Sequence, residues 1–273
     1  AMLEAAMEGN LDTLYVVGED IAGLFPDATF AEIALRKTGY LVVQDSFMTE
    51  TAKMADLVLP SGEFTEKRGT LTNQEGRVHN IGALLSPPGE ARTDHEIFYE
   101  LGSALINGFE GEDAESVFEK IKNNIKSYSH IDMDFSQNEE KCGCMITKGN
   151  GNELTMGTLV EETHELKGGG SFTLMTGNHL LHSGRLSSNS EILNSLSGEA
   201  TVEISAEDGE GLGVSPGDKV VVSGNGFEAT VSVRIKNGSK SGVAFLPEHY
   251  TKAPANRFLE RNSAMAQVTI RPA

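Results

Sequence analysis

The sequence has little cysteine, no tryptophan, a shortage of basic residues and no long apolar run. Two cysteines are too few for a disulfide framework, which favours a reducing, cytoplasmic setting. Basic side chains number 22 against 40 acidic ones, and the formal charge of −18 repels nucleic acid and anionic membrane surfaces. No apolar run approaches the roughly 20 residues that span a bilayer. We therefore expect no nucleic-acid partner and no direct membrane insertion.

Length and composition divide the chain into three parts. A chain of 273 residues favours two domains over one. We assign residues 1–107 to an α/β domain, 108–170 to a polar connector that contains a helix, and 171–273 to a β domain. Ala1 precedes Met2 and structure is expected to begin at once, so we expect the first residue not to be a natural domain edge.

The first domain has the pattern of a parallel sheet. Short apolar runs at residues 14–17, 41–43 and 57–59 stop at glycine, polar residues or proline, as buried strands do. The first two runs are separated by a helical pattern, and the whole unit has the length of a right-handed parallel crossover. We expect part of a doubly wound, Rossmann-like sheet that lacks the strands preceding it.

Two helices are expected to cover this sheet. The first begins at Asp27 and ends at Gly39, and the second covers residues 94–105. Apolar side chains at helical spacing are expected to face the sheet, namely Phe30, Ile33 and Ala34 in the first helix and Ile97, Leu101 and Leu105 in the second.

Polar residues follow the second strand, where a ligand site is expected. In an open α/β sheet, ligands bind outside the carboxyl ends of the strands, which favours the segment from Asp45 to Thr49. The alternative is an ordinary strand, turn and helix start, with Thr49 to Thr51 capping the helix. Gly18 ends the first strand and has two interpretations, a close approach to a ligand or a tight turn.

The last hundred residues have the pattern of a small barrel. A short helix near residues 206–212 ends at Gly213. Six short apolar runs are separated by glycine and asparagine turns, at residues 172–175, 200–204, 219–223, 229–235, 243–246 and 266–270. Such a series predicts a closed β-barrel.

Two separate stretches carry a family resemblance. VVQDSFMTETAKMADLVLP, EFTEKRGTLTNQEGRVHN and PPGEARTDHEIFYELGSAL resemble the region that follows the catalytic-metal segment in the molybdopterin oxidoreductase family. ISAEDGEGLGVSPGDKVVV resembles the molybdopterin-dinucleotide-binding domain of the same family, a double-psi β-barrel. The two stretches occur in the family's own order, so the resemblance implies a partial Rossmann-like domain followed by that barrel.

The resemblance also implies a set of cofactor-binding residues. Thr-Gly and His-Ser-Gly sequences near the start of the barrel domain match positions that approach the pterin and its nucleotide, and a later loop matches a second ligand segment. Asn178 stands where an arginine is usual, which removes a bidentate anion contact. The expected set is Gly18, Asp45, Thr49, Thr176, Gly177, His182, Ser183, Gly184, His249 and Asn256. A structural role for the two histidines remains the alternative.

Catalytic and metal-binding residues are not expected in this chain. Cys142 and Cys144 lie one residue apart, but no further ligand completes a metal shell, so we interpret them as unligated thiols. By the resemblance, iron-sulfur clusters would belong to a missing N-terminal part.

By the same resemblance the chain is most like the large iron-sulfur subunit of NADH-quinone oxidoreductase, respiratory complex I. A molybdenum or tungsten formate dehydrogenase and a non-catalytic scaffold that binds a protein partner are the alternatives. The implied cofactor is molybdopterin guanine dinucleotide, and the cleft for it is either functional or a structural vestige. Other subunits of a respiratory oxidoreductase are the implied partners, and they would hold the chain at the periphery of the inner membrane.

Overall fold

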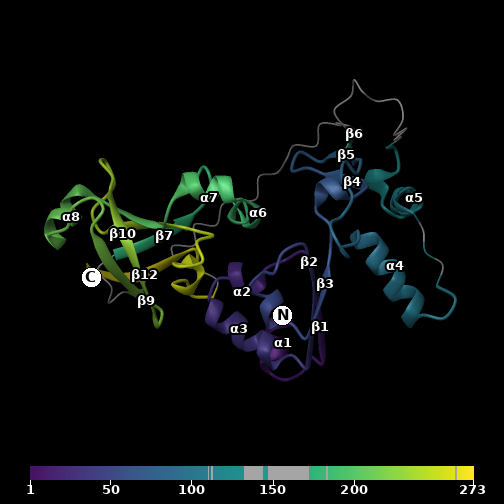
Figure 1. The fold of residues 1–273 in the computed structure, drawn as a ribbon, viewed down its shortest axis with the longest axis horizontal. Helices are drawn as coiled ribbons and strands as arrows, with labels where there is room; N and C mark the ends of the chain where they lie inside the picture. Colours follow the sequence, from purple (N-terminus) through teal and green to yellow (C-terminus); the bar gives the residue numbers. More distant parts are fainter. Residues whose placement is uncertain (110, 112, 132–143, 147–171, 183, 262) are drawn as a thin grey trace.

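The computed structural model describes residues 1–109, 111, 113–131, 144–146, 172–182, 184–261 and 263–273. These residues form a three-stranded parallel sheet with helices, a second small sheet with its own helices, and a closed β-barrel (Figure 1). The expected order, an α/β domain followed by a barrel, is confirmed. Cys142, His164 and the part of the connector at 147–170 lie outside the described residues.

The parallel sheet has the predicted strands. β1 (Thr13–Val17), β2 (Tyr40–Asp45) and β3 (Leu57–Pro60) are parallel in the order β1-β2-β3. Their apolar side chains form one core with those of the adjoining helices. Because parallel strands end at the same edge, Val17 and Asp45 deliver the loops that follow them to one side of the sheet.

Three helices lie beside this sheet, α1 (Met2–Met7), α2 (Ile21–Leu24) and α3 (Ala28–Lys37). The inner side of α3 differs from the expectation, because Ile33 is exposed. Small alanines replace it at the contact, which lets the helix pack closely. The buried residues of α3 are Ala28, Ala31, Ala34 and Leu35.

The second sheet was not expected as strands. It consists of β4 (Gly69–Thr72), β5 (Arg77–Ile81) and β6 (Cys144–Met145), in an antiparallel arrangement. The helix expected to cover the parallel sheet is present as α4 (Asp94–Leu105), and the helix expected in the connector is present as α5 (Ala114–Asn124). A small core joins α5 to β5 through Val78, Phe118 and Ile131.

The apolar side expected for α4 is only partly buried. Ile97 is buried, whereas Leu105 is exposed together with the neighbouring Ile106. The helix begins at a capping box in which Thr93 and Glu96 satisfy each other's backbone N–H groups. α4 therefore ends beyond the surface that its first turns cover.

The barrel contains all six predicted strands. Its order is β10-β8-β11-β7-β12-β9, with parallel pairs β10/β8 and β11/β7 among antiparallel ones. The strands are β7 (Phe172–Gly177), β8 (Thr201–Ile204), β9 (Lys219–Gly224), β10 (Phe227–Ile235), β11 (Val243–Pro247) and β12 (Met265–Pro272). α6 (Arg185–Ser188) and α7 (Glu191–Ser197) follow β7 and were not predicted. α8 (Ala206–Leu212) ends as predicted at Gly213, whose φ is +67°.

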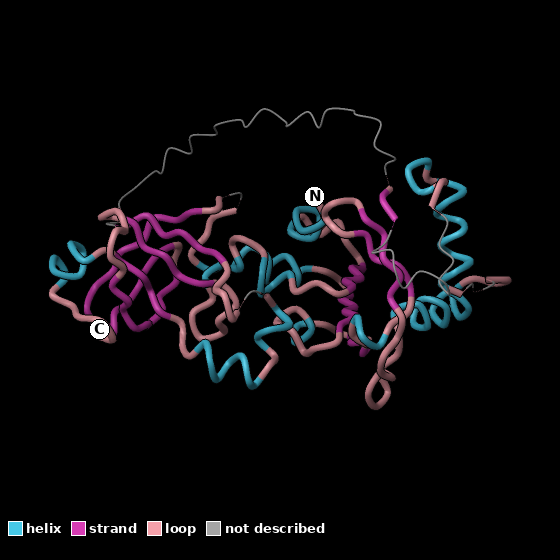
Figure 2. Tube along the Cα trace, turned by 90° about the horizontal axis from the view of Figure 1, so that it is seen from above, coloured by secondary structure: helices cyan, strands magenta, loops and turns pink. Residues whose placement is uncertain are grey.

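The barrel contacts the parallel sheet domain through its segment 254–261, which lies next to α2 and α3 (Figure 1). Seen from above, helices lie between the barrel strands at one end of the molecule and the strands of the two sheets toward the other end (Figure 2). Asn256 Nδ2 donates to the carbonyl oxygens of Ala22 and Phe25, at 3.2 and 3.1 Å. Arg257 forms an ion pair with Glu32. These bonds hold the barrel loops over the carboxyl edge of the sheet.

Candidate functional site

A cavity of about 400 Å³, called the cleft below, lies between the sheet domain and the barrel. Its lining comes from four segments, residues 20–32, 47–53, 185–189 and 248–259. The first two segments follow β1 and β2, and the last two belong to barrel loops. A volume of this size falls in the range of small-molecule sites.

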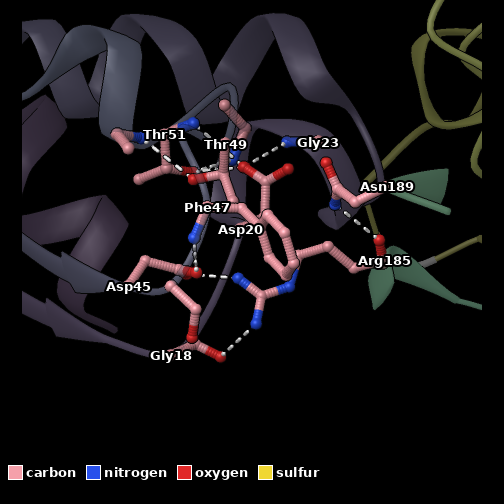
Figure 3. Close-up of polar contacts among 12 residues, drawn as sticks. Gly18, Asp20, Gly23, Asp45, Phe47, Thr49, Thr51, Arg185 and Asn189 are labelled. Carbon is pink, nitrogen blue, oxygen red and sulfur yellow. Dashed lines mark hydrogen bonds and ion pairs between the residues drawn. The ribbon is translucent and has the colours of Figure 1, made fainter. Parts of the chain in front are cut away.

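Asp20 joins the two loops on the sheet side of the cleft (Figure 3). Its Oδ1 accepts hydrogen bonds from the backbone N and the Oγ1 of Thr51, at 2.9 and 2.8 Å, and from Gly23 N at 3.3 Å. Thr51 Oγ1 in turn accepts from Ala22 N at 2.9 Å. Asp20 therefore fixes the backbone of both loops at the cleft wall.

Thr49, which the sequence predicted as a cofactor-binding residue, lines the cleft on this side. Its Oγ1 accepts a hydrogen bond at 3.1 Å from the backbone N of Ala52, the first residue of the short 3₁₀ turn Ala52–Met54. The expected helix start is therefore present, although it continues for only one turn. The ligand-site and helix-start interpretations of this segment are compatible.

Asp45 is covered by an arginine from the barrel. Its side chain is fully buried, Oδ1 accepts from Phe47 N at 3.1 Å, and Oδ2 forms an ion pair with Arg185 Nη1. Arg185 Nη2 also lies 3.5 Å from the carbonyl oxygen of Gly18 (Figure 3). Arg185 thus contacts the carboxyl ends of both β1 and β2.

Gln44, the residue before Asp45, lies on the opposite face of the sheet and is also fully buried. Its Oε1 accepts from the Tyr15 hydroxyl, and its Nε2 donates to Asp94 Oδ1 at 2.5 Å. Lys67 Nζ pairs with the other oxygen of Asp94 at 2.5 Å. Burial raises the pKa of Tyr15, and the nearby Asp94 carboxylate raises it further. This network fastens α4 to the sheet.

On the barrel side, His182 and His249 support each other. His182 Nε2 donates to the carbonyl oxygen of His249 at 3.1 Å, and the His182 ring meets the Tyr250 ring edge-on at 4.6 Å. His249 Nε2 lies 3.0 Å from Asn178 Oδ1, which can only accept, so this nitrogen carries the proton. Thr176 Oγ1 donates to Glu248 Oε1 at 2.7 Å.

His249 has a backbone φ of +68°, a conformation that is energetically unfavourable for a residue with a β-carbon. Burial lowers the pKa of His249 and outweighs Glu248, which raises it, while the nearby His182 lowers it further. The unfolded chain therefore binds this proton more tightly than the folded chain does. The contribution of neutral His249 to stability is present above its unfolded pKa of about 6.5 and falls as the pH drops below it.

We predict that His249→Asn makes the stability less dependent on pH between 7.5 and 5. Asparagine tolerates the positive φ and does not titrate. Urea unfolding of both proteins across this range measures the effect. An unchanged pH slope in the variant would contradict the prediction.

The structure separates the predicted site residues into two groups. Thr49, His249 and Asn256 line the cleft. A second group is not part of the cleft lining, namely Gly18, Asp45, Thr176, Gly177, His182 and Gly184. His182 lines a neighbouring cavity of about 230 Å³ instead. Ser183 lies outside the described residues. The positive φ of Gly18, +64°, fits the tight-turn interpretation. Ligand binding by these residues stays a prediction.

Arg185 lines the cleft and was missed. Its partner Asp45 precedes it by 140 residues, so no local spacing connects the two. Among the described residues, no group of three histidine, cysteine or acidic side chains could hold a metal ion. No helix in the described part of the chain is long and apolar enough to cross a membrane.

Two protein families match the chain. Residues 1–104 match "Molybdopterin oxidoreductase", and residues 172–272 match "Molydopterin dinucleotide binding domain". The second of these suggests a molybdopterin cofactor. The boundaries correspond to the sheet region and the barrel.

Curated relatives span nearly the whole chain. The G 2 subunit of the NADH-quinone oxidoreductase of Rhizobium meliloti is 32% identical over 99% of this chain and 31% of its own length. The alpha subunit of the F420-dependent formate dehydrogenase of Methanocaldococcus jannaschii is 33% identical over 90% of this chain and 40% of its own length. The chain thus spans less than half the length of these relatives.

A solved structure shares the fold. Acetylene hydratase from Pelobacter acetylenicus superimposes with a TM-score of 0.65 over 97% of this chain and 42% of its own chain. The sequences are 16% identical, so this likeness concerns the fold alone.

Proposed function

Since this chain belongs to the molybdopterin oxidoreductase family, we propose that its cleft receives the nucleotide end of a molybdopterin dinucleotide within a larger subunit of the NADH-quinone oxidoreductase type. One observation carries the proposal: the cleft lies at the carboxyl ends of β1 and β2 and is covered by loops of the barrel. Ligands of open α/β sheets bind at this edge.

The side chains that line the cleft have the chemical properties needed to bind a dinucleotide. A dinucleotide offers flat heterocycles and a pyrophosphate. Phe47 and Tyr250 provide aromatic surface, and three cations, Lys53, Arg185 and Arg257, can attract phosphate oxygens. Acidic side chains in the lining can accept hydrogen bonds from the N–H groups of a purine or pterin.

When bound, the cofactor would supply metal-centred redox chemistry. Residues of this chain would bind and orient its nucleotide end and exclude water from it. In this proposal, the protein ligand of the metal would lie in a part of the subunit outside this sequence. Iron-sulfur clusters would likewise lie outside this sequence, and partner subunits would hold the assembly at the membrane.

A scaffold role is the second candidate, and one observation favours it. Each cation of the cleft lining is already paired with a carboxylate: Lys53 with Glu50, Arg257 with Glu32, and Arg185 with Asp45. A pyrophosphate must compete with these pairs. In the scaffold role, the same pairs simply close a vestigial cleft and stabilise the domain contact.

The cofactor content of the full-length subunit separates the two roles. We expect protein made in a molybdopterin-producing host to release an oxidised, fluorescent pterin on denaturation. Met48→Glu, which adds a charge at an exposed position of the cleft, should lower this content severalfold through repulsion of phosphate. Leu84→Glu adds the same charge at an exposed position outside the cleft lining and should leave it unchanged.

Pterin-free wild-type subunit would favour the scaffold role. The guanine form of the cofactor is tested separately, by titrating the chain with guanosine and cytidine diphosphates. Tighter binding of the guanosine nucleotide supports molybdopterin guanine dinucleotide. Equal affinities would contradict that assignment.

A further inference from the structure

Arg185 lies between Asp45 and the cleft. Arg185 is part of the cleft lining, whereas Asp45 is not. The Asp45 side chain is 0% exposed and the Arg185 side chain is 20% exposed. A ligand in the cleft therefore meets the guanidinium and cannot reach the carboxylate behind it.

The guanidinium can bind two anions at once. It carries five N–H donors in a planar fork. One nitrogen contacts Asp45 and a second has a long contact to the carbonyl oxygen of Gly18, which leaves donors for the cleft side. A lysine ammonium has no such second edge.

The other two cations of the cleft are less suited to an anion. Lys53 is 55% exposed, so water screens its charge. Arg257 is held between the Glu32 carboxylate and the Phe227 ring, whose centroid lies 5.6 Å from its guanidinium carbon. Arg185 combines low exposure with a position at the carboxyl ends of two parallel strands.

We infer that Arg185 is the anion-binding residue of the cleft and that Asp45 is its positioning residue, which does not itself contact the ligand. The inference rests on the proposed function and names the part of the ligand concerned, a phosphate or pyrophosphate group. It changes the role that the sequence suggested for Asp45, from ligand contact to support.

Arg185 stays on Asp45 when the ligand binds. If Arg185 moved away, the buried Asp45 carboxylate would be left without an ion-pair partner, which is strongly unfavourable. Asp45 therefore orients the guanidinium and at the same time offsets part of its charge. The pair lowers the affinity of the cleft for anions in general and favours ligands that add further contacts.

The test is calorimetric titration of the full chain with inorganic pyrophosphate at low ionic strength. Arg185→Gln should weaken binding by roughly 10-fold or more, as expected for loss of a charged hydrogen bond. Asp45→Asn should tighten it by roughly 3- to 10-fold, because a neutral amide oxygen competes less strongly than a carboxylate for the guanidinium donors of Arg185. In the Arg185→Gln background, Asp45→Asn should have no further effect, and this double variant has no unpaired buried charge.

Lys236→Gln is the matched control, because it removes an exposed, carboxylate-paired cation outside the cleft lining, and it should change affinity by less than about twofold. Unchanged pyrophosphate affinity in the folded double variant would overturn the inference. So would an equal effect of Asp45→Asn with and without Arg185, because Asp45 would then act independently.

The outcome is separable from that of the proposed function. If the full-length subunit lacks pterin but Arg185 still governs pyrophosphate affinity, the anion site stands and the cofactor role fails. If the subunit contains pterin and the folded double variant retains it fully, the cofactor role stands and the inference fails. A parallel titration with a nucleoside diphosphate distinguishes a nucleotide ligand from free pyrophosphate. Only the nucleotide has a base that can stack on the aromatic side chains of the cleft and so bind more tightly.

Discussion

Arg185→Ala should lower the free energy of unfolding of the sheet domain by about 3 kcal/mol, at the lower end of values for a broken buried ion pair. The loss arises because the Asp45 side chain is fully buried and would be left without its ion-pair partner. The lower end applies because Arg185 is itself partly exposed, so some water can enter. Urea unfolding followed by circular dichroism measures the change.

Two comparisons test the cause. Asp45→Asn combined with Arg185→Gln removes both charges and should recover most of the stability, since no buried charge remains unpaired. Arg271→Ala breaks an exposed pair with Glu228 on the barrel and should cost less than about 0.5 kcal/mol. Equal losses for Arg185→Ala and Arg271→Ala would contradict the buried-charge explanation.

Phe258→Ala should destabilise the barrel by about 4 kcal/mol, as for other large-to-small changes of aromatic core residues. Phe258 is fully buried and its ring meets that of Phe227 edge-on, with centroids 5.1 Å apart. It follows directly on Asn256 and Arg257, which contact the sheet domain. A cavity at this position should therefore also loosen the contact between the domains.

Thermal unfolding and limited proteolysis measure the two effects of Phe258→Ala. The matched control is Phe64→Ala, which removes the same side chain at an exposed position and should change stability by less than about 0.5 kcal/mol. If Phe258→Ala leaves the melting temperature of the barrel unchanged, its ring is not a core element. If proteolysis between the domains is unaffected, the barrel core and the domain contact are independent.

The strands were predictable because their signals are local. Each barrel strand combines a β-branched or apolar run with glycine or asparagine turns, and all six were found. The parallel sheet followed from the same signal together with the length of its crossover. The glycine that ends α8 was predictable for a similar reason, because Gly213 supplies the positive φ of a helix end.

The structural predictions that were wrong or missing depend on contacts between residues far apart in the sequence. The inner side of α3 depends on how closely the helix approaches the sheet, and alanines pack there in preference to Ile33. Strands β4 and β5 have few apolar side chains, and their pairing is stabilised partly by α5. Leu105 has the right spacing on α4 but lies beyond the surface that the helix covers.

The candidate site was predictable in location but not in detail. The carboxyl edge of the sheet follows from parallel topology, so a cleft near Thr49 was expected. Arg185 gave no signal, because an isolated arginine after a glycine fits any surface turn. Its role depends on how the barrel is positioned on the sheet, and that position is fixed by contacts between residues far apart in the sequence.

The opposite orientations of the adjacent side chains of Gln44 and Asp45 limit where this chain can tolerate insertions and deletions. Successive side chains of a strand face opposite sides, so β2 presents an amide to Tyr15 and Asp94 and a carboxylate to Arg185. A single residue added or deleted in β2 before Gln44 would turn both side chains to the opposite faces. A deletion would bring the carboxylate opposite Asp94, and an insertion would bring the neutral amide opposite Arg185. Length variation is therefore compatible with function only in the loops on either side of this strand, where the register is preserved.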